Sequence, residues 1–389
     1  MILKIKYITD NKKQEYYYYK FIYMKYIINR ENILKPLQQI TSIVERRQTM
    51  PILSHVLFNK GINGLQLTTT DLEVEIVAQV KNSTAPDEEI TLPARKFLDI
   101  CKSLPAEKEL ELETSENKTT LRSGRSRFSL AALLATEFPV FEDQEGTSSF
   151  TFEMATLKKL IERTAFSMAQ QDVRYYLNGL LIEITPEKIR AVATDGHRLA
   201  LAEADHKGGG EETVQAIIPR KGVLELARLL GEEEESAEIA LSKNHLVAIL
   251  SDYKLTSKLI DGKFPDYEKV IPTDGDKKII VSVASLKEAL QRAAILSNEK
   301  YRGVPFHCED GKIKIQAQNP EKEDAEVELE ADYGGEAVEV GFNVTYLLEA
   351  LDAIEEKSAE ITLKNGNSSA VVTGQGAEGS KYVIMPMRL

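Results

Sequence analysis

Four landmarks recur three times, in the same order, along this chain of 389 residues. The first is an amphipathic segment with basic residues beside its apolar face, the second a polar turn, the third a strand-to-helix junction and the fourth a closing residue pair that ends in proline. In this order they lie at 33–37, 157–161 and 286–290; at Thr70-Asp71, Thr194-Asp195 and Gln318-Asn319-Pro320; at 92–96, 218–222 and 340–343; and at Phe138-Pro139, Phe264-Pro265 and Met385-Pro386. Repeats of about 120–130 residues have the size of whole domains, so we expect three domains of one fold instead of a single core.

The segments between the landmarks indicate what each domain contains. Stretches such as 68–80 and 188–204 alternate apolar and polar residues in part, which is typical of half-buried antiparallel strands. A second amphipathic helix follows each strand-to-helix junction, at 97–104, 223–230 and 346–354. The sequence therefore predicts an α+β protein of three tandem domains, each with two helices and antiparallel sheets. The predicted boundaries are 24–146, 147–267 and 268–389.

The first 23 residues differ in composition from the rest of the chain. They contain five lysines, two carboxylates and the run Tyr16-Tyr17-Tyr18-Tyr19, and a second methionine, Met24, opens the first repeat. We interpret residues 1–23 as an N-terminal extension that is disordered or arises from an upstream start site. The functional alternative is a basic aromatic arm that touches DNA, because tyrosines can stack on bases and lysines can pair with phosphates.

The formal net charge of −12 argues against a protein that binds nucleic acid through an open, basic surface. Any such role requires the cations to gather on one surface. Basic residues in or beside the repeated helices are Lys35, Arg95, Lys96, Lys158, Lys159, Arg163, Arg220, Lys221, Arg228, Lys287 and Arg292. If these helices share one face of an assembly, an acidic protein acquires a basic lining there.

The sequence shows no sign of export or of a membrane anchor. No apolar run approaches the ~20 residues of a membrane-spanning helix, and no secretory segment precedes a cleavage site. The two cysteines, Cys101 and Cys308, lack any metal-ligand spacing, so we expect reduced thiols. These features predict a cytoplasmic protein.

Sequence signatures of common enzymes are missing as well. No P-loop, zinc-protease, acyl-transfer or calcium-binding motif occurs, and the five histidines show no ligand pairing, so we expect no metal. A glycine pattern of the dinucleotide-binding type lies at 374–379, but no helix follows it, so we interpret it as a hairpin turn and expect no cofactor. The cluster 194–198 (TDGHR) combines groups used in acid–base catalysis, although a tight Asp-Gly turn between strands explains it more simply.

Four longer motifs carry a resemblance to a known family. They lie at 171–179 (QDVRYYLNG), 193–200 (ATDGHRLA), 264–267 (FPDY) and 382–389 (YVIMPMRL). Together they closely resemble the bacterial DNA polymerase III beta subunit, and the similarity runs from Met24 to Leu389. The resemblance implies a DNA sliding clamp, a processivity factor without catalysis. It also implies a head-to-tail homodimer that closes into a ring of six domains, with helices inside around the duplex and sheets outside.

In this family, short linear peptides of partner proteins dock into a hydrophobic pocket between the second and third domains. The matching positions are Leu177, Thr194, Gly196, His197, Arg198, Leu199, Pro265, Lys269, Val270, Val383, Ile384, Met385, Pro386, Met387, Arg388 and Leu389. The family often has Arg where this chain has Lys269, and a lysine at the pocket rim lacks the planar, bidentate contact that arginine offers. The implied partners are the polymerase III alpha subunit, the clamp loader, other DNA polymerases, and mismatch-repair or ligase proteins.

The resemblance implies two further surfaces. Sequence-independent contacts with double-stranded DNA are implied for Arg47, Gln171, Arg174, Tyr175 and Tyr176. The implied dimer interface has an apolar centre between complementary charged rims, which favour encounter and register. Its residues are Phe128, Leu130, Ile295 and Leu296 at the centre, Lys118, Arg125 and Arg127 on the basic rim, and Glu321, Glu323, Asp324 and Glu326 on the acidic rim.

Two other functions stay open on the sequence alone. One is a hydrolase or lyase that uses Asp195 and His197. The other is a scaffold that binds peptides through the same pocket without forming a ring around DNA. Loss of turnover in an Asp195→Ala protein would favour the first, and a protein that stays monomeric would favour the second.

Overall fold

The structure is a computed structural model, and it describes residues 24–45, 50–62, 64–115, 117–142, 148–206, 212–231 and 235–388, together with the backbone of 2–7 and 16–21. It divides into two compact units. Unit 1 comprises Met1–Gly146 and Val247–Ser257, and unit 2 comprises Thr147–Leu246 and Lys258–Leu389. The second and third predicted domains therefore lie together in unit 2, apart from one short segment.

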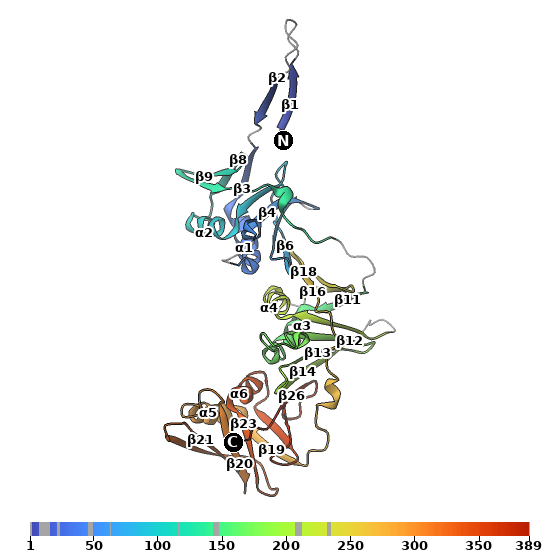
Figure 1. Cartoon of the computed structure of the whole chain (residues 1–389), viewed down its shortest axis with the longest axis vertical. Helices are drawn as coiled ribbons and strands as arrows, with labels where there is room; N and C mark the ends of the chain where they lie inside the picture. The colour runs from blue at the N-terminus through green and yellow to red at the C-terminus, as the bar shows by residue number, and fades with distance from the viewer. Residues whose placement is uncertain are drawn as a thin grey trace. The chain divides into compact units, whose positions relative to one another are not determined.

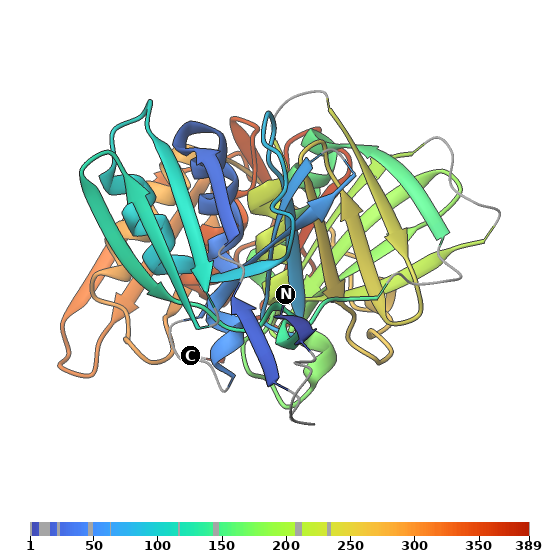
Figure 2. The same cartoon turned by 90° about the horizontal axis from the view of Figure 1, so that it is seen from above.

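Unit 1 packs two helices, α1 (Arg30–Ile40) and α2 (Ala94–Ser103), against antiparallel sheets. One sheet has the strand order β10, β9, β8, β3, and the other contains β18, β6, β5, β4 and β7 in that order. Figure 2 shows strands β8 to β10 in teal, with helices on one side of them. The strands are β3 (Met24–Asn29), β4 (His55–Gly61), β5 (Gly64–Thr70), β6 (Val74–Gln79), β7 (Ile90–Pro93), β8 (Glu109–Ser115), β9 (Lys118–Ser123), β10 (Ser126–Ala131) and β18 (Tyr253–Lys258).

Local sequence explains where α1 begins and which face it buries. The side-chain oxygen of Asn29 accepts a hydrogen bond from the backbone N–H of Glu31 at 3.0 Å and caps the helix. Ile33, Leu37 and Ile40 follow at helical spacing, and all three are fully buried. Thr69 of β5 donates a hydrogen bond to the carbonyl of Ile40 at 2.7 Å, so the end of the helix is tied to the sheet beneath it.

Ahead of β3, the backbone of the N-terminal extension forms an antiparallel hairpin of β1 (Ile2–Tyr7) and β2 (Tyr16–Phe21), drawn in dark blue in Figure 1. Its register pairs Ile2 with Phe21 and Tyr7 with Tyr16. The role of this extension and the suggested start at Met24 stay predictions.

The described part of unit 2 contains the α-helices α3 (Met154–Glu162), α4 (Arg220–Leu229), α5 (Val283–Ala294) and α6 (Val344–Asp352). An antiparallel sheet of eight strands has the order β15, β12, β13, β14, β26, β25, β24, β19, and a four-stranded sheet has the order β22, β21, β20, β23. The strands are β11 (Ser148–Glu153), β12 (Gly179–Ile184), β13 (Lys188–Thr194), β14 (Arg198–Asp205), β15 (Val214–Pro219), β16 (Ser236–Leu241), β19 (Lys277–Ser282), β20 (Gly303–Glu309), β21 (Lys312–Gln318), β22 (Asp324–Glu330), β23 (Val338–Asn343), β24 (Ser358–Leu363), β25 (Ala370–Gly374) and β26 (Ser380–Ile384). Strand β17 (His245–Ile249) has its first two residues in unit 2 and the rest in unit 1.

The predicted α+β class is confirmed by this arrangement. The three predicted first helices lie within α1, α3 and α5, and the predicted second helices overlap α2, α4 and α6. The glycine pattern at 374–379 forms the turn between β25 and β26, as predicted. Gly376 and Gly379 have φ values of 72° and 97°, which residues other than glycine rarely adopt. A dinucleotide site at this position is therefore excluded by the hairpin.

We expect unit 1 to lose stability in mild acid because of His55. This side chain is buried beside Thr91, and burial lowers its pKa to about 4. In the unfolded chain the histidine takes up a proton near pH 6.5, whereas the folded protein resists protonation until about pH 4. The stabilisation, at most about 3 kcal/mol, is therefore present above pH 6.5 and lost as the pH falls towards 4.

Urea unfolding of unit 1, followed by hydrogen exchange at several pH values, would measure this loss. In a His55→Gln protein, the free energy of unfolding of unit 1 should change less between pH 6.5 and 4. The matched control is His307→Gln, because His307 is more exposed and lies in unit 2. An unchanged slope in His55→Gln would contradict the assignment.

Candidate partner-binding site

The C-terminal strand joins the second and third repeats into one sheet. β26 lies between β25 of its own repeat and β14 of the second repeat (Figure 1). The register pairs Arg198 with Ile384 and Leu199 with Val383. Beyond the strand, the backbone N–H of Met385 donates to the carbonyl of His197 at 3.0 Å. Two motifs that are far apart in the sequence are thus hydrogen-bonded neighbours.

The segment between β13 and β14 is a tight turn held by its own side chains. The carboxylate of Asp195 accepts hydrogen bonds from the backbone N–H groups of His197 and Arg198 at 2.9 and 3.0 Å. The hydroxyl of Thr194 donates to the carbonyl of Arg198 at 2.6 Å. Gly196 has a φ of 87°, and a Cβ there would lie 2.8 Å from Nη1 of Arg174. Asp195 is therefore occupied in shaping the turn, as the simpler of the two sequence interpretations predicted.

Arg198 leaves this turn and connects the two repeats. Its guanidinium lies over the rings of Phe166 and Tyr346, with its central carbon 5.4 and 4.4 Å from the ring centroids. Nη2 donates to the carbonyl of Phe166 at 2.6 Å, Nε pairs with Asp195 at 3.1 Å, and Nη1 pairs with Glu349 of α6. With its side chain only 10 % exposed, Arg198 holds the second and third repeats together more than it offers a free charge.

A segment between the second and third repeats, 264–271, covers part of the eight-stranded sheet; we call it the strap. Phe264 and Tyr267 of the strap are buried against apolar side chains of five strands. The strands contribute Leu181, Val192, Leu199, Leu201, Ile217 and Val383. This small core is separate from the larger core of the third repeat, and it fixes Pro265 and Val270 near the turn and the C-terminal strand.

Tyr267 anchors the strap through its hydroxyl. The hydroxyl donates to Oε1 of Glu183 at 2.8 Å, and the same oxygen pairs with Nη1 of Arg190 at 3.1 Å. Burial raises the pKa of Tyr267 to about 12, and Glu183 adds to the rise. Burial alone would raise the pKa of Glu183, but hydrogen bonds from Gln215, Tyr267 and Arg190 lower it. The network therefore keeps a buried carboxylate charged and paired.

The structure brings the turn, the strap and the C-terminal strand together, and the predicted pocket residues lie at different depths. Leu177, Leu199 and Val383 are buried, and Thr194 is nearly so. His197, Lys269, Val270, Met385 and Arg388 are exposed, and Gly196, Arg198, Pro265, Pro386 and Met387 are partly exposed. Ile384 packs into the core of the third repeat instead, because alternate residues of a strand face opposite sides of the sheet. Leu389 lies outside the described residues.

Three residues that shape this site were not predicted from the sequence. Tyr346 and Glu349 lie on α6 and hold Arg198, and Glu183 holds the strap. Tyr346 had a weak signal, because it lies in the predicted second helix of the third repeat at helical spacing from Glu349. Glu183 had none, since a carboxylate on a strand usually faces water.

The predicted DNA-contacting residues, apart from Arg47, lie on the loop that precedes β12, which includes a short 3-10 helix at Tyr175–Leu177. Arg174 is held by Asp172, with contacts of 3.0 and 2.8 Å, and it also donates to the carbonyl of Asp195 at 3.1 Å. These hydrogen bonds lower the pKa of Asp172 to about 2. Gln171 and Tyr175 are exposed, whereas Tyr176 packs against the core under the strap. Arg47 lies outside the described residues.

The predicted interface residues lie on or near two edge strands, one in each unit, except Ile295 and Leu296, which follow the end of α5. In unit 1, β10 is an edge strand, with Leu130 buried, Phe128 half-buried, and Arg125 and Arg127 exposed nearby. In unit 2, β22 is an edge strand, and its outward carboxylates include Asp324 and Glu326. Of the remaining predicted residues, Leu296 is half-buried, and the others are exposed: Lys118, Glu321, Glu323 and Ile295.

Among the described residues, no group of three or more His, Cys, Asp or Glu side chains could hold a metal ion. No helix in the same part of the chain is both long and apolar enough to cross a membrane. Cys101 and Cys308 are free and buried, and burial raises the pKa of each thiol to about 12, so neither is a ready nucleophile.

Comparison with known proteins gives three consecutive matches to one family. The models describe the DNA polymerase III beta subunit, with its N-terminal domain at 24–142, its central domain at 151–266 and its C-terminal domain at 268–388. The matches follow one another in the order of the three repeats.

Relatives and solved structures agree with these matches. The beta sliding clamp of Pseudomonas putida is 49% identical over 367 residues, which is 94% of this chain and 100% of the relative, and that of Escherichia coli is 45% identical over 368 residues with the same coverage. A crystal structure of the DNA polymerase sliding clamp from Pseudomonas aeruginosa has a TM-score of 0.90 at 48% identity, covering 94% of this chain and 100% of that one. A sliding clamp of the same organism bound to griselimycin also has a TM-score of 0.90, at 48% identity and with coverage of 95% and 100%. The chain belongs to the family of the DNA polymerase III beta subunit, the beta sliding clamps.

Proposed function

We propose that this chain is a DNA sliding clamp, a processivity factor that encircles duplex DNA as a ring-shaped homodimer and catalyses no reaction. Membership of the clamp family across all three repeats supports this function. The observation that supports tethering most directly is the meeting of the C-terminal motif, the turn at 194–198 and the strap on one surface. The hydrolase or lyase alternative loses its support, because Asp195 is occupied by the backbone of its own turn.

A head-to-tail dimer would use the open edges of β10 and β22. Each edge strand carries unpaired backbone groups that can continue a sheet into a second copy. Cations beside β10 would face carboxylates on β22, and Ile295, which is 78% exposed, would be covered together with Phe128 and Leu130. Because the two edges differ, the contact is heterologous, and such a contact gives a ring when its rotation closes.

Topological retention explains how an acidic protein can hold DNA. A closed ring needs only weak phosphate contacts that ignore sequence, and these permit sliding. On the loop before β12, a phosphate would have to displace Asp172 from Arg174, so any contact made there would be short-lived. Gln171 and Tyr175 are exposed on the same loop, and Tyr176 is half-buried behind them. We assign all four, with Arg47, to the DNA-facing surface.

The surface formed by the turn, the strap and the C-terminal motif is the proposed pocket for partner peptides. Buried Leu177, Leu199 and Val383 would form its floor, and the exposed side chains of Val270 and Met385 its walls. Lys269 is paired with Asp266 at 2.6 Å on the exposed rim. The proposed partners are the polymerase III alpha subunit, the clamp loader, other DNA polymerases, and mismatch-repair or ligase proteins. A Pseudomonas aeruginosa relative has been solved with griselimycin bound.

Three further assignments complete the proposal. The domains would span 24–146, 147–267 and 268–389. Residues 1–23 would precede the natural start at Met24, which mass spectrometry of the protein from its native source would test. The protein would act in the cytoplasm, together with the replication machinery.

We expect the clamp, once loaded by a compatible clamp loader, to remain on circular plasmid and to leave quickly when the plasmid is linearised. The reason is that a ring can slide off a free end but not off a circle. Gel filtration of the loaded complex before and after restriction digestion measures retention, with a clamp of proven loading as the control. Equal retention on both forms would mean ordinary surface binding and would rule out the ring.

Deletion of 385–389 should abolish stimulation of the polymerase while the dimer still forms. The truncation ends after β26, so the pairing of β26 with β14 remains, while the tail of the pocket is lost with its hydrogen bonds to His197 and Gly341. Removing the central anchors of a peptide site typically lowers affinity by about tenfold or more. Primer extension measures stimulation, and sedimentation checks the dimer. Full stimulation by the truncated chain would exclude the pocket assignment.

The Tyr267→Phe protein should bind a peptide of the polymerase III alpha subunit about three- to tenfold more weakly. Loss of one hydrogen bond to a buried charged group costs about 1.5–3 kcal/mol, and part of this would appear as a looser strap. Fluorescence anisotropy with a labelled peptide measures the affinity. Tyr26→Phe is the matched control, because it removes a similar bond to the carbonyl of Thr84 in unit 1. Equal affinities for the two variants would show that the anchor does not shape the pocket.

A further inference from the structure

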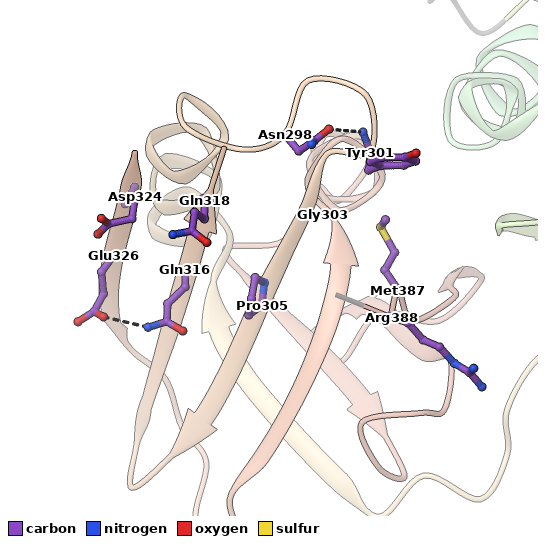
Figure 3. A pocket seen from close by; sticks show the side chains of 12 residues that line it. Asn298, Tyr301, Gly303, Pro305, Gln316, Gln318, Asp324, Glu326, Met387 and Arg388 are labelled. Carbon is purple, nitrogen blue, oxygen red and sulfur yellow. Dashed lines mark hydrogen bonds between the residues drawn. The ribbon is translucent and has the colours of Figure 1, made fainter. Parts of the chain in front are cut away.

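A second groove lies on the third repeat and ends at the C-terminal tail. It has a volume of about 660 Å³ and crosses the exposed face of the sheet formed by β22, β21 and β20 (Figure 3). Gln316 and Gln318 of β21 point into it, while the alternate residues Ile315 and Ala317 face the core. A cavity of this volume can hold several residues of a peptide. None of its residues other than those of the tail belongs to the proposed pocket.

Side-chain amides that line the groove offer both hydrogen-bond donors and hydrogen-bond acceptors. Gln318 is exposed, and among the described residues its side chain makes no hydrogen bond, although its backbone pairs with Asp324 in the sheet. Gln316 donates to Glu326 at 3.0 Å, which leaves its carbonyl oxygen open. The carbonyl oxygen of Asn298 accepts from the backbone N–H groups of Lys300 and Tyr301, which leaves its NH2 group open. An extended peptide presents one donor and one acceptor per residue, so these amides can bind its backbone whatever its sequence.

The other end of the groove is apolar and is shared with the proposed pocket. Tyr301, which is 57% exposed, and Met387 lie near each other there (Figure 3). The backbone N–H of Met387 donates to the carbonyl of Gly341 at 2.8 Å, which fixes the tail across β23. Met387 and Arg388 thus line the groove and also belong to the proposed peptide pocket. A peptide that leaves the pocket past Met387 enters the groove directly.

We propose that this groove binds the segment that flanks the docking motif of a partner protein. The inference rests on the proposed function of the neighbouring pocket. With the motif in the pocket, the flanking chain continues past Met387 and lies extended across β20 and β21. Asp324 and Glu326 stand at the far end, where the proposed second copy would pair with them, so the amides of the groove, and not its charge, bind an extended peptide. In a closed ring, the second copy would extend the sheet beyond β22, and the groove would end at the subunit interface.

The test compares two labelled peptides by fluorescence anisotropy on the full-length dimer. The short peptide carries only the docking motif of the polymerase III alpha subunit, and the long peptide adds six serine and lysine residues on each side. We expect the long peptide to bind the wild type about fivefold more tightly than the short one. In Gln318→Ala and Tyr301→Ala, the long peptide should fall to the affinity of the short one, whose own affinity should not change. Gln375→Ala is the matched control, because Gln375 is an exposed glutamine outside the groove.

Each outcome separates this proposal from the one on which it rests. Equal affinity of the two peptides for the wild type overturns the groove and leaves the pocket intact. Failure of both peptides to bind overturns both. A gain that persists in Gln318→Ala and Tyr301→Ala, or that Gln375→Ala also loses, shows a general charge effect and overturns the groove. If sedimentation shows that the two groove variants lose the dimer without a change in peptide affinity, the groove belongs to the subunit interface and the proposal falls.

Discussion

The pairing of β26 with β14 is the interaction on which the functional surface depends. It brings the last strand of the chain against a strand of the preceding repeat and continues one antiparallel sheet through both. The hydrogen bond from Met385 to His197 extends the same register past the end of the strand. Because a shift of one residue would turn every side chain of β26 to the other face, this register decides that Val383 faces the strap and Ile384 the core.

Two buried polar groups maintain the geometry around this ladder. Arg198 spans the repeats between two aromatic rings and two carboxylates, and Tyr267 fixes the strap through Glu183 and Arg190. Buried charges of this kind add little net stability, since removing them from water offsets much of their attraction. Arg198 and Tyr267 instead favour a single arrangement of the chain, because any arrangement that separated them from their partners would leave a buried charge unpaired. A surface that binds short peptides needs such a fixed shape, since a partner segment brings little order of its own.

Strands of neighbouring repeats pair within the chain, and the same kind of pairing between copies would close the proposed ring. The middle repeat gives β14 to the sheet of the third repeat, and its strand β18 pairs with β6 of the first. The strands β10 and β22 remain as open edges in the first and third repeats. Pairing of β10 in one copy with β22 in the next is a contact between two different edges, and such a heterologous contact joins copies head to tail, as a ring requires. The acidic net charge is compatible with this role, because a closed ring stays on DNA without strong contacts to the phosphates.

The sequence by itself determined the number of repeats, the α+β class, the helix positions and the family, because these depend on local periodicity and on long motifs that stay together in the chain. It also indicated that Asp195 belongs to a turn, since an Asp-Gly pair between strands has a strong local preference. Only the tertiary structure decided that Arg174 is paired with Asp172. It alone revealed the parts of Tyr346 and Glu183 in the site, the face on which Ile384 lies, and the second groove beside Met387. These depend on which strands are neighbours and on which face a side chain points to, and both follow from pairing between distant segments that no local pattern encodes.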